Sequence, residues 1–316
     1  MKKLMALMLC LVMVFAMAGC GNTNETEATD ATMADTFTVG ICQLMVHDSL
    51  DAATKGFVDA LTEKMDAAGK TVEFDTQVAG DANLCTTVIN TFTAKDVDLI
   101  MANATPALLA AASATDSIPV LGTSVTDYTD TFKGAIPSNV TGTSDAVPFD
   151  EQAQMMIDTL KLTAGDQVGV LYCSDESNSK IQYEAVKALF EAKGIVVKAY
   201  TFSEATELQT LVTTACGECK AIYVPSDNTV ADNDSIVGSV CSEKKIPVYT
   251  SYGGKICYAS LAINYYALGE ETGKMAAQIL LGQKTPADIE VATLTPAVVY
   301  NKDLCAALGT EVPAEN

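Results

Sequence analysis

The chain has 316 residues, and its 40 acidic residues outnumber its 19 basic residues, so that the formal net charge at pH 7 is −21. A surface this acidic repels phosphate backbones, which excludes nucleic acid as a partner. All the basic residues are lysines. A bound carboxylate must therefore be held by lysine, by hydroxyl groups or by backbone N–H groups, without the two-pronged contact of a guanidinium group.

The first twenty residues, MKKLMALMLCLVMVFAMAGC, have the pattern of a bacterial lipoprotein signal. Two lysines precede an apolar run, and small residues precede Cys20. An ordinary secretory signal and a spanning anchor are the alternatives, but the run is shorter than the ~20 residues of a spanning helix. We expect a signal peptide at 1–19, lipid on Cys20, a flexible acidic tether at 20–35 and attachment to the outer face of the bacterial cell membrane.

From residue 36 onward, short β-rich runs alternate with longer amphipathic runs. The first series predicts strands at 36–44, 71–78, 97–104 and 118–125 and helices at 49–68, 81–95 and 105–115. After an expected loop with Gly134, Pro137 and Gly142, the second series predicts strands at 167–173, 195–202, 220–226 and 246–251 and helices at 147–162, 178–193, 204–214 and 229–243. This alternation predicts an α/β fold with two similar lobes, each with a parallel sheet.

The last part of the chain does not continue the alternation. It contains a β-rich run at 258–264, a helical run at 265–282, the string ATLTPAVVY at 292–300 and a short final helix. We expect this tail to complete the two lobes by crossing between them.

The residues that directly follow the predicted strands are mostly Ser, Thr, Asp and Asn. Ligands of open parallel sheets bind beyond the carboxyl ends of the strands. The same residue types are favoured helix N-caps, and helix N-termini also bind anions. His47, the only histidine, follows the first strand. It is either a loop residue or cap, or a ligand contact with an ordinary pKa of about 6.5.

Catalytic and metal chemistry find little support in the sequence. One histidine is too few for a typical metal centre, and no G-x-S-x-G nucleophile motif is present. We expect most of the cysteines to be buried free thiols. Cys216 and Cys219 form the one close pair, CGEC, for which a turn disulfide and plain thiols both remain open, with metal or redox chemistry as the less favoured alternative.

Several strings of this chain resemble one known family. They are VGICQL, HDSLDAATKGF, FTAKDVDLIMANATPALLAAASATDSIPVLGTSVTD, NVTGTSD, AIYVPSDNTV and LAINYYALGEETGKMAAQILLG, in this order between about residues 36 and 300. They are similar to ABC-transporter substrate-binding proteins of the tryptophan/tyrosine type. The resemblance implies a type I periplasmic-binding-protein fold, with two Rossmann-like lobes of parallel sheets joined by a three-segment hinge. The expected lobes are 36–142 with 252–285, and 143–251 with 286–316.

The resemblance also implies ligand-binding positions in the cleft between the lobes. Carried over residue by residue, they are Gln43, His47, Thr105, Pro106, Thr126, Asp127, Ser144, Asp145, Asn178, Ser179, Asp227, Asn228, Thr229 and Tyr265. Two departures are visible. Asp48 stands where relatives often have proline, and the string SYGG at 251–254 lacks an acidic residue that relatives often carry nearby.

The implied function is a lipid-anchored, monomeric receptor that passes a small ligand to an ABC permease and ATPase, with no cofactor. An aromatic or other apolar amino acid is the expected ligand. Its carboxylate would bind near Thr105, Ser144 or Ser179, its ammonium group at Asp227 or Asp145, and its side chain among Tyr252, Tyr265 and Tyr266. A nucleoside, sugar or short peptide receptor is the alternative, and an α/β enzyme is a distant one.

Overall fold

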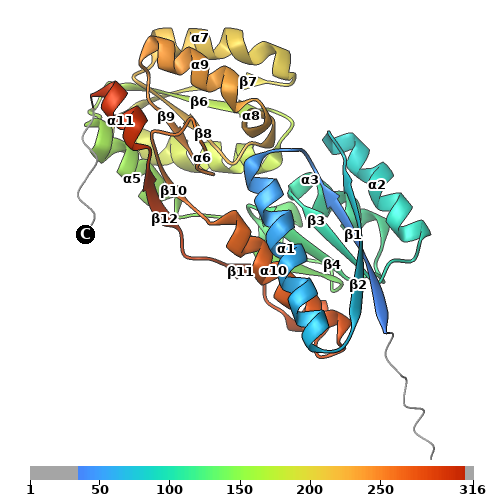
Figure 1. Ribbon diagram of the computed structural model, residues 1–316. Coiled ribbons are helices and arrows are strands. Elements are labelled where there is room, and N and C mark those ends of the chain that lie inside the picture. The colour runs from blue at the N-terminus through green and yellow to red at the C-terminus, as the bar shows by residue number, and fades with distance from the viewer. Residues whose placement is uncertain (1–34, 310–316) are drawn as a thin grey trace, which may run out of the picture. The chain divides into compact units, whose positions relative to one another are not determined.

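The computed structural model describes residues 35–309. The expected signal peptide at 1–19, the lipidation site Cys20 and the tether at 20–35 lie outside the described residues, apart from Asp35. The described residues 35–309 belong to one compact unit that contains two lobes, each built around a six-stranded sheet (Figure 1). Within the described range, no helix has the length and apolar character needed to span a bilayer.

The first sheet is entirely parallel and has the strand order β11-β5-β4-β3-β1-β2. Its strands are β1 (Thr36–Gln43), β2 (Thr71–Val78), β3 (Leu99–Asn103), β4 (Val120–Val125), β5 (Val140–Ser144) and β11 (Ala292–Thr293). The accompanying helices are α1 (Asp48–Ala67), α2 (Ala82–Ala94), α3 (Thr105–Ala114), α4 (Tyr128–Thr131), α10 (Tyr265–Leu280) and the 3₁₀ turn η2 (Pro286–Asp288).

The second sheet has the strand order β12-β10-β9-β8-β6-β7 and is parallel except for the antiparallel edge strand β12. Its strands are β6 (Gln167–Cys173), β7 (Val196–Phe202), β8 (Ala221–Val224), β9 (Val248–Thr250), β10 (Ala259–Ala262) and β12 (Ala297–Tyr300). The helices are α5 (Phe149–Leu160), α6 (Ser177–Ala192), η1 (Ala205–Glu207), α7 (Leu208–Glu218), α8 (Asn228–Asp232), α9 (Asp234–Lys244) and α11 (Lys302–Leu308).

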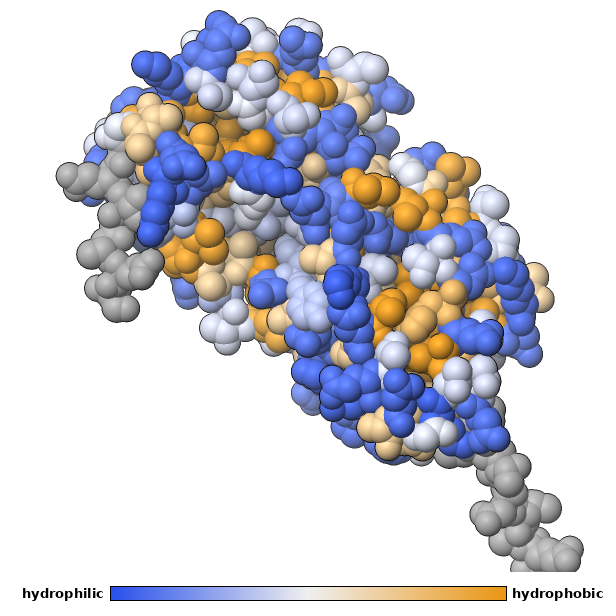
Figure 2. All heavy atoms as spheres, in the orientation of Figure 1, coloured by the Kyte–Doolittle hydropathy of each residue, from blue (hydrophilic) through white to orange (hydrophobic). Residues whose placement is uncertain are grey.

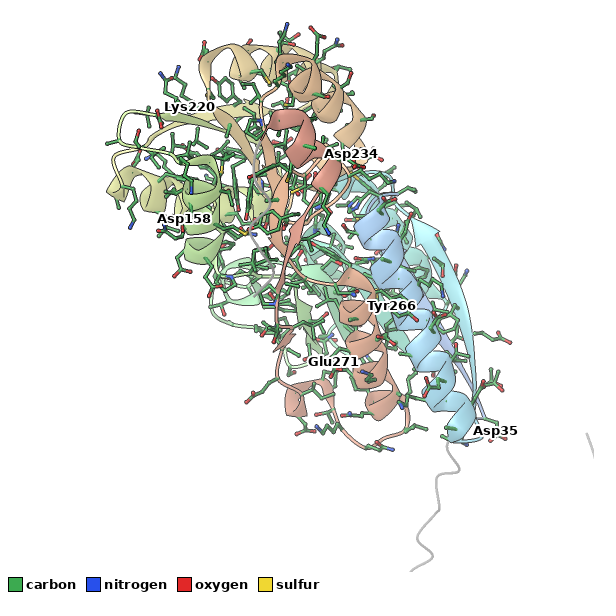
Figure 3. The ribbon with its side chains drawn as sticks, turned by 60° about the vertical axis from the view of Figure 1, so that its left-hand side comes forward. Asp35, Asp158, Lys220, Asp234, Tyr266 and Glu271 are labelled. Atoms are coloured by element: carbon green, nitrogen blue, oxygen red, sulfur yellow. The ribbon has the colours of Figure 1, made fainter. Side chains whose placement is uncertain are left out.

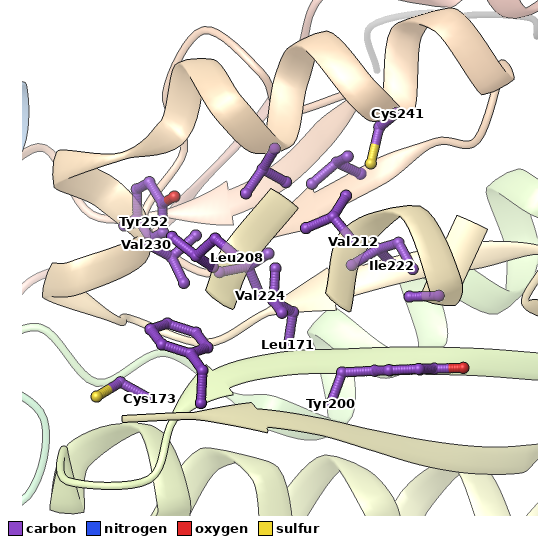
Figure 4. Packing of buried hydrophobic residues seen from close by; sticks show 14 of the residues in the cluster. Leu171, Cys173, Tyr200, Leu208, Val212, Ile222, Val224, Val230, Cys241 and Tyr252 are labelled. Carbon is purple, nitrogen blue, oxygen red and sulfur yellow. The ribbon is translucent and has the colours of Figure 1, made fainter. Parts of the chain in front are cut away.

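Each sheet is covered on both faces by helices, because its strands are apolar on both sides. In the second lobe, residues of α7 and α9 pack on one face and residues of α5 and α6 on the other. Figure 4 shows Val212 of α7 and Cys241 of α9 over Leu171 and Ile222 of the sheet. Hydrophilic residues predominate on the molecular face in Figure 2, in keeping with the large negative charge.

The chain crosses between the sheets three times, after β5, after β10 and after β11. This topology differs from the expected lobe boundaries. The strand β10 belongs to the second sheet although 252–285 was expected in the first lobe, and β11 belongs to the first sheet although 286–316 was expected in the second. The string ATLTPAVVY forms two strands in different sheets, and Pro296, which cannot donate a ladder hydrogen bond, lies between them.

Two further local expectations were wrong. The expected loop at 134–142 contains the start of β5, whose Gly142 has a φ of 141°. A side chain there would collide with the backbone, since a Cβ atom would lie 2.0 Å from the carbonyl oxygen of Gly122. The expected helix at 229–243 is broken at Asn233 into α8 and α9.

The helix α10 returns to the first lobe and packs closely against α1 (Figures 1 and 3). Two glycines allow this approach, because a Cβ atom at Gly269 would lie 1.9 Å from the Ala53 carbonyl oxygen and one at Gly56 would lie 2.1 Å from that of Tyr266. The Tyr266 hydroxyl donates to Asp59 of α1 at 2.8 Å. This close packing fixes the start of α10, where Tyr265 lies.

Candidate functional site

A small cavity lies where the carboxyl ends of the two sheets face each other. Its lining comes from both lobes and consists of His47, Leu50, Ser124, Thr126, Asp145, Asn178, Ser226, Asp227, Asn228, Ala231, Tyr252 and Tyr265. The volume is about 10 Å³, which is room for about one water molecule. An organic ligand therefore enters only when the lobes or the lining side chains move.

A larger groove of about 1340 Å³ lies on the second lobe beside α5 and β12. None of its lining residues carries a buried polar atom that lacks a hydrogen-bond partner in the described part of the chain. Specific ligand sites are marked by convergent polar groups. We therefore place the candidate site in the smaller cavity.

The second-lobe wall contains two buried carboxylates that are saturated with donors. Glu176 accepts hydrogen bonds from the backbone N–H groups of Asn228 and Thr229 at 2.9 and 2.8 Å. The side chains of Asn178, Asn228 and Thr229 also donate to it, at 2.8 to 3.1 Å. Glu176 therefore stabilises the start of α8 by bonding its free N–H groups.

Asp227 is 1% exposed and also lies at the start of α8. It accepts from the backbone N–H of Cys173 at 2.7 Å, from that of Val230 at 2.9 Å and from the Ser179 hydroxyl at 2.8 Å. Burial raises the pKa of Asp227 well above its ordinary value, and the nearby charge of Glu176 raises it further. Both Asp227 oxygens are thus engaged within the second lobe.

Asp145, which follows β5 in the first lobe, is bonded differently. Its Oδ2 accepts from the Tyr265 hydroxyl at 2.8 Å, but its Oδ1 is buried and has no partner among the described residues. Burial raises the pKa of Asp145, while the hydrogen bond from Tyr265 and the nearby hydroxyl group of Thr126 oppose this shift. An unpaired buried carboxylate oxygen is energetically costly unless a cation or donor approaches it.

Three other lining residues carry buried polar atoms without a partner in the described protein: Ser124 Oγ, Asn178 Oδ1 and the Tyr252 hydroxyl. Ser124 has a φ of 55°, in the left-handed region, at a point where the pairing register between β4 and β5 shifts. Such irregularities at strand ends redirect side chains and are concentrated at functional sites. Here the irregularity directs Ser124 into the cavity.

A hydrogen-bonded network lies beneath the cavity. The Tyr223 hydroxyl donates to Gln152 at 2.7 Å, and Gln152 donates to Ser251 at 3.2 Å. The Ser226 hydroxyl donates to the Ser251 hydroxyl at 3.2 Å, and the backbone N–H of Ser226 donates to Gln182 Oε1 at 3.0 Å. Gln182 also donates to Thr126 of the first lobe at 3.3 Å. The network holds the floor of the cavity in place and connects the two lobes.

His47 lies at the edge of the cavity and contacts the other lobe. Its Nε2 is 3.4 Å from Asn228 Oδ1, and burial lowers its pKa, although Asn228 and the carboxylates of Glu176, Asp51 and Asp232 act in the opposite direction. The neighbouring Asp48 pairs with Lys255 of the second lobe at 2.8 Å. The loop after β1 and the first residue of α1 therefore contact the second lobe at two points.

The sequence-predicted site residues fall into two groups. Those that line the cavity are His47, Thr126, Asp145, Asn178, Asp227, Asn228, Tyr252 and Tyr265. Those that do not are Gln43, Thr105, Pro106, Asp127, Ser144, Ser179 and Thr229. Tyr266, expected beside the ligand side chain, instead packs between α1 and α10.

Most residues outside the lining support the fold around it. Gln43 bonds to Asp51, Thr54 and the Met45 carbonyl oxygen, which orders the loop that carries His47. Ser179 and Thr229 donate to the buried carboxylates of Asp227 and Glu176.

Three other residues of this group lie at loop or helix starts. Asp127 caps α4. Ser144 bonds to the backbone of Thr126 and Ala146. Pro106 lines a separate groove beside α2 and α3. Asp127 and Ser144, with Gln43, Ser179 and Thr229, therefore support the structure around the cavity without lining it, whereas Pro106 belongs to another groove.

Sequence reasoning missed Ser124, Ser226, Leu50 and Ala231 in the lining, as well as Glu176 behind it. Ser124 lies in SVTD at the end of β4, and Ser226 lies in PSDNT directly after β8. Glu176 lies in SDESNS, directly before α6. No residue pattern distinguishes an inward-facing side chain in these strings from a capping one, since both use the same residue types.

Comparison with known proteins identifies the family. The family model of the ABC transporter substrate-binding protein matches residues 38–315. The chain belongs to this family. It is 33% identical over 325 residues to a tyrosine-binding protein of Clostridioides difficile strain R20291, covering 97% of this chain and 92% of that protein. The family comprises solute-binding proteins and is not an enzyme family.

Two solved structures are informative about the arrangement of the lobes. A domain from Streptococcus pneumoniae in complex with L-Trp is 32% identical and has a TM-score of 0.80, with 88% of this chain and 96% of that chain covered. A ligand-free, open substrate-binding protein from Clostridium difficile is 34% identical, covers the same shares and has a TM-score of 0.66. The fold is thus of the type I periplasmic-binding-protein class, and the chain as a whole is structurally more similar to the L-Trp complex than to the ligand-free, open structure.

Proposed function

We propose that this chain is the solute-binding component of an ABC importer and captures an aromatic amino acid in the cavity between its lobes. The observation that carries the proposal is the set of unpaired polar atoms around the cavity. Two of them, Asp145 Oδ1 and Asn178 Oδ1, are acceptors, and the other two, on Ser124 and Tyr252, belong to hydroxyl groups that can donate. Acceptors and donors of this kind suit the two charged ends of an amino acid.

The ammonium group of the ligand binds to Asp145. This carboxylate is 6% exposed and retains one oxygen without a partner in the described protein, whereas both oxygens of Asp227 are taken by donors of its own lobe. A charge-assisted hydrogen bond from an ammonium group to a buried carboxylate is stronger than a neutral one. The cavity lining contains no lysine, so no side-chain cation competes for Asp145 there.

The ligand carboxylate binds to the hydroxyl groups of Ser124 and Tyr252, which agrees with a chain that lacks arginine. The apolar part of the ligand packs on Leu50, Ala231 and the ring of Tyr265. Because the cavity holds only about one water molecule in volume, binding includes an opening of the lobes followed by closure. The contacts of His47 with Asn228 and of Asp48 with Lys255 break and re-form in this movement.

The setting of this activity follows from the N-terminal sequence and the family. We propose that the lipid on Cys20 anchors the protein to the outer face of the bacterial cell membrane after cleavage of residues 1–19. The acidic tether lets the binding unit reach the permease and ATPase of the transporter. The protein acts as a monomer, without a cofactor and without catalysis.

The test is a thermal-shift panel of amino acids, nucleosides, sugars and short peptides. L-tyrosine or L-tryptophan at a hundred times its Kd is expected to add about 2.7 kcal/mol to the free energy of unfolding. Two analogues separate the charged ends: tyramine lacks the carboxylate, and 3-(4-hydroxyphenyl)propionate lacks the ammonium group. We expect 3-(4-hydroxyphenyl)propionate to produce no shift in melting temperature, because it lacks the ammonium group that binds to Asp145. A shift produced only by a sugar, nucleoside or peptide would contradict the proposal.

A further inference from the structure

Two buried cysteines of the second lobe have their sulfur atoms in contact. Cys216 lies in the last turn of α7, Cys241 lies in α9, and their Sγ atoms are 3.4 Å apart. Figure 4 shows Cys241 directed from α9 into the cluster that α7 and α9 share. Cys219, the neighbour of Cys216 in CGEC, instead has its Sγ atom 3.5 Å from the Tyr200 hydroxyl.

We propose that Cys216 and Cys241 form a reversible disulfide that joins α7 to α9 when the protein meets a disulfide oxidant. A disulfide bond of about 2.05 Å needs only a short further approach of two sulfurs that already touch. The alternative pairing within CGEC would require Cys219 to leave Tyr200. The chain segment enclosed by the bond contains α8, whose first residues form part of the cavity wall.

The environment of Cys216 favours its role as the attacking group. The contact with Cys241 lowers the pKa of Cys216, and the charge of Lys244 acts in the same direction. Cys216 is 8% exposed, whereas Cys241 is 2% exposed. The thiolate is the reactive form of cysteine, and nearby cations increase its population. Cys216 is therefore the sulfur that a dissolved oxidant reaches first.

The reaction is a two-step exchange with a small disulfide such as oxidised glutathione. The Cys216 thiolate attacks one glutathione sulfur, forms a mixed disulfide and releases one glutathione thiolate. The Cys241 thiolate, after loss of its proton to solvent, then attacks the Cys216 sulfur and releases the second glutathione thiolate. Two protein thiols are oxidised, one molecule of oxidised glutathione is reduced to two of glutathione, and a thiol reductant reverses both steps.

The test compares the full chain after incubation with dithiothreitol or with oxidised glutathione, followed by alkylation, digestion without reduction and peptide mass analysis. The expected result is a cross-linked peptide pair that contains Cys216 and Cys241, and a melting temperature about 5 °C or more above that of the reduced protein. Cys241→Ser should lose both effects of oxidation, whereas the matched control Cys219→Ser should keep both.

Three results would overturn the proposal. They are free thiols at Cys216 and Cys241 after oxidation, a stable glutathione adduct on Cys216 without the cross-link, and a cross-link that joins Cys216 or Cys241 to a different cysteine, such as Cys216 to Cys219. Since each protein is compared with its own reduced form, a variant that is less stable overall still gives a clear answer.

Discussion

The buried carboxylates on the two sides of the cavity differ in how their oxygens are used. In the second lobe, Glu176 and Asp227 are surrounded by backbone N–H groups and hydroxyl groups of the same lobe. In the first lobe, Asp145 has one hydrogen bond, from Tyr265, and one oxygen without a partner in the described chain. Residues of the same chemical type thus have different tasks, since a saturated carboxylate stabilises the fold and an unsaturated one remains available to a ligand.

The most severe way to test this difference is to remove Asp227. In Asp227→Ala, the N–H groups of Cys173 and Val230 and the hydroxyl of Ser179 lose their acceptor in the protein interior. We expect the free energy of unfolding to fall by about 3 kcal/mol, because buried donors left unsatisfied are costly. Urea denaturation of the ligand-free protein measures this. A loss below about 1 kcal/mol, within the usual range of a single hydrogen bond, would show that Asp227 is not a structural centre.

The matched substitution in the first lobe is Asp145→Asn. The new amide oxygen can still accept from Tyr265, so we expect the unfolding free energy to change by less than about 1 kcal/mol. The affinity for L-tyrosine or L-tryptophan should fall about 100-fold, since the ammonium group loses a charged acceptor. Isothermal titration calorimetry gives the affinity. Unchanged binding would move the ammonium site away from Asp145.

Acid should weaken binding through the same group. Burial raises the pKa of Asp145 in the free protein, and a bound ammonium group lowers it because it favours the ionised carboxylate. The ligand affinity is therefore highest when the pH is above the pKa of Asp145 in the ligand-free protein. It falls about tenfold per pH unit once the pH drops below that pKa. A pH series of titrations should show this slope for the native chain and a flatter one for Asp145→Asn. Equal slopes would argue against the assignment.

His47 should contribute less than the carboxylate. In His47→Ala the contact with Asn228 across the lobes is lost, and we expect affinity to fall about fivefold, which corresponds to about one neutral hydrogen bond. The matched variant His47→Gln can still donate to Asn228 and should retain most of the affinity. Equal affinities of both variants and the native chain would return His47 to the role of a loop residue.

The smallest effect is expected at the outer ion pair of Asp48 and Lys255. Both side chains are largely exposed, at 78% and 82%, so solvent and salt screen their attraction. Lys255→Ala should change ligand affinity by no more than about twofold, and less at high salt, as followed in the same titration. A tenfold change in ligand affinity would mean that closure of the lobes depends on the exposed ion pair between Asp48 and Lys255.

The alternating elements and the edge of each sheet that faces the cavity could be predicted from the sequence, because β1, β3, β4 and β6 are largely apolar runs that end at, or directly before, a polar residue. The sequence did not reveal β5, since VTGTS is polar and is held in place by contacts of Gly142 with Gly122. Nor did it reveal that Pro296 separates strands of different sheets.

For the candidate site, the sequence indicated which strand ends line the cavity but not how each side chain is bonded there. Asp145 and Asp227 were both expected as partners of an ammonium group because the family resemblance placed both in the cleft. Their difference depends on donors that come from distant segments, such as Cys173 and Ser179 for Asp227. Three-dimensional packing alone determines which carboxylate is satisfied.

A crystal structure of the protein in complex with L-tyrosine or L-tryptophan tests the central claim most directly. The account predicts closed lobes with the ligand nitrogen at hydrogen-bond distance, about 2.7–3.2 Å, from Asp145 Oδ1, while Asp227 keeps its bonds to Cys173, Val230 and Ser179. A ligand nitrogen bound to Asp227 or Glu176 instead, with no contact to Asp145, would contradict it.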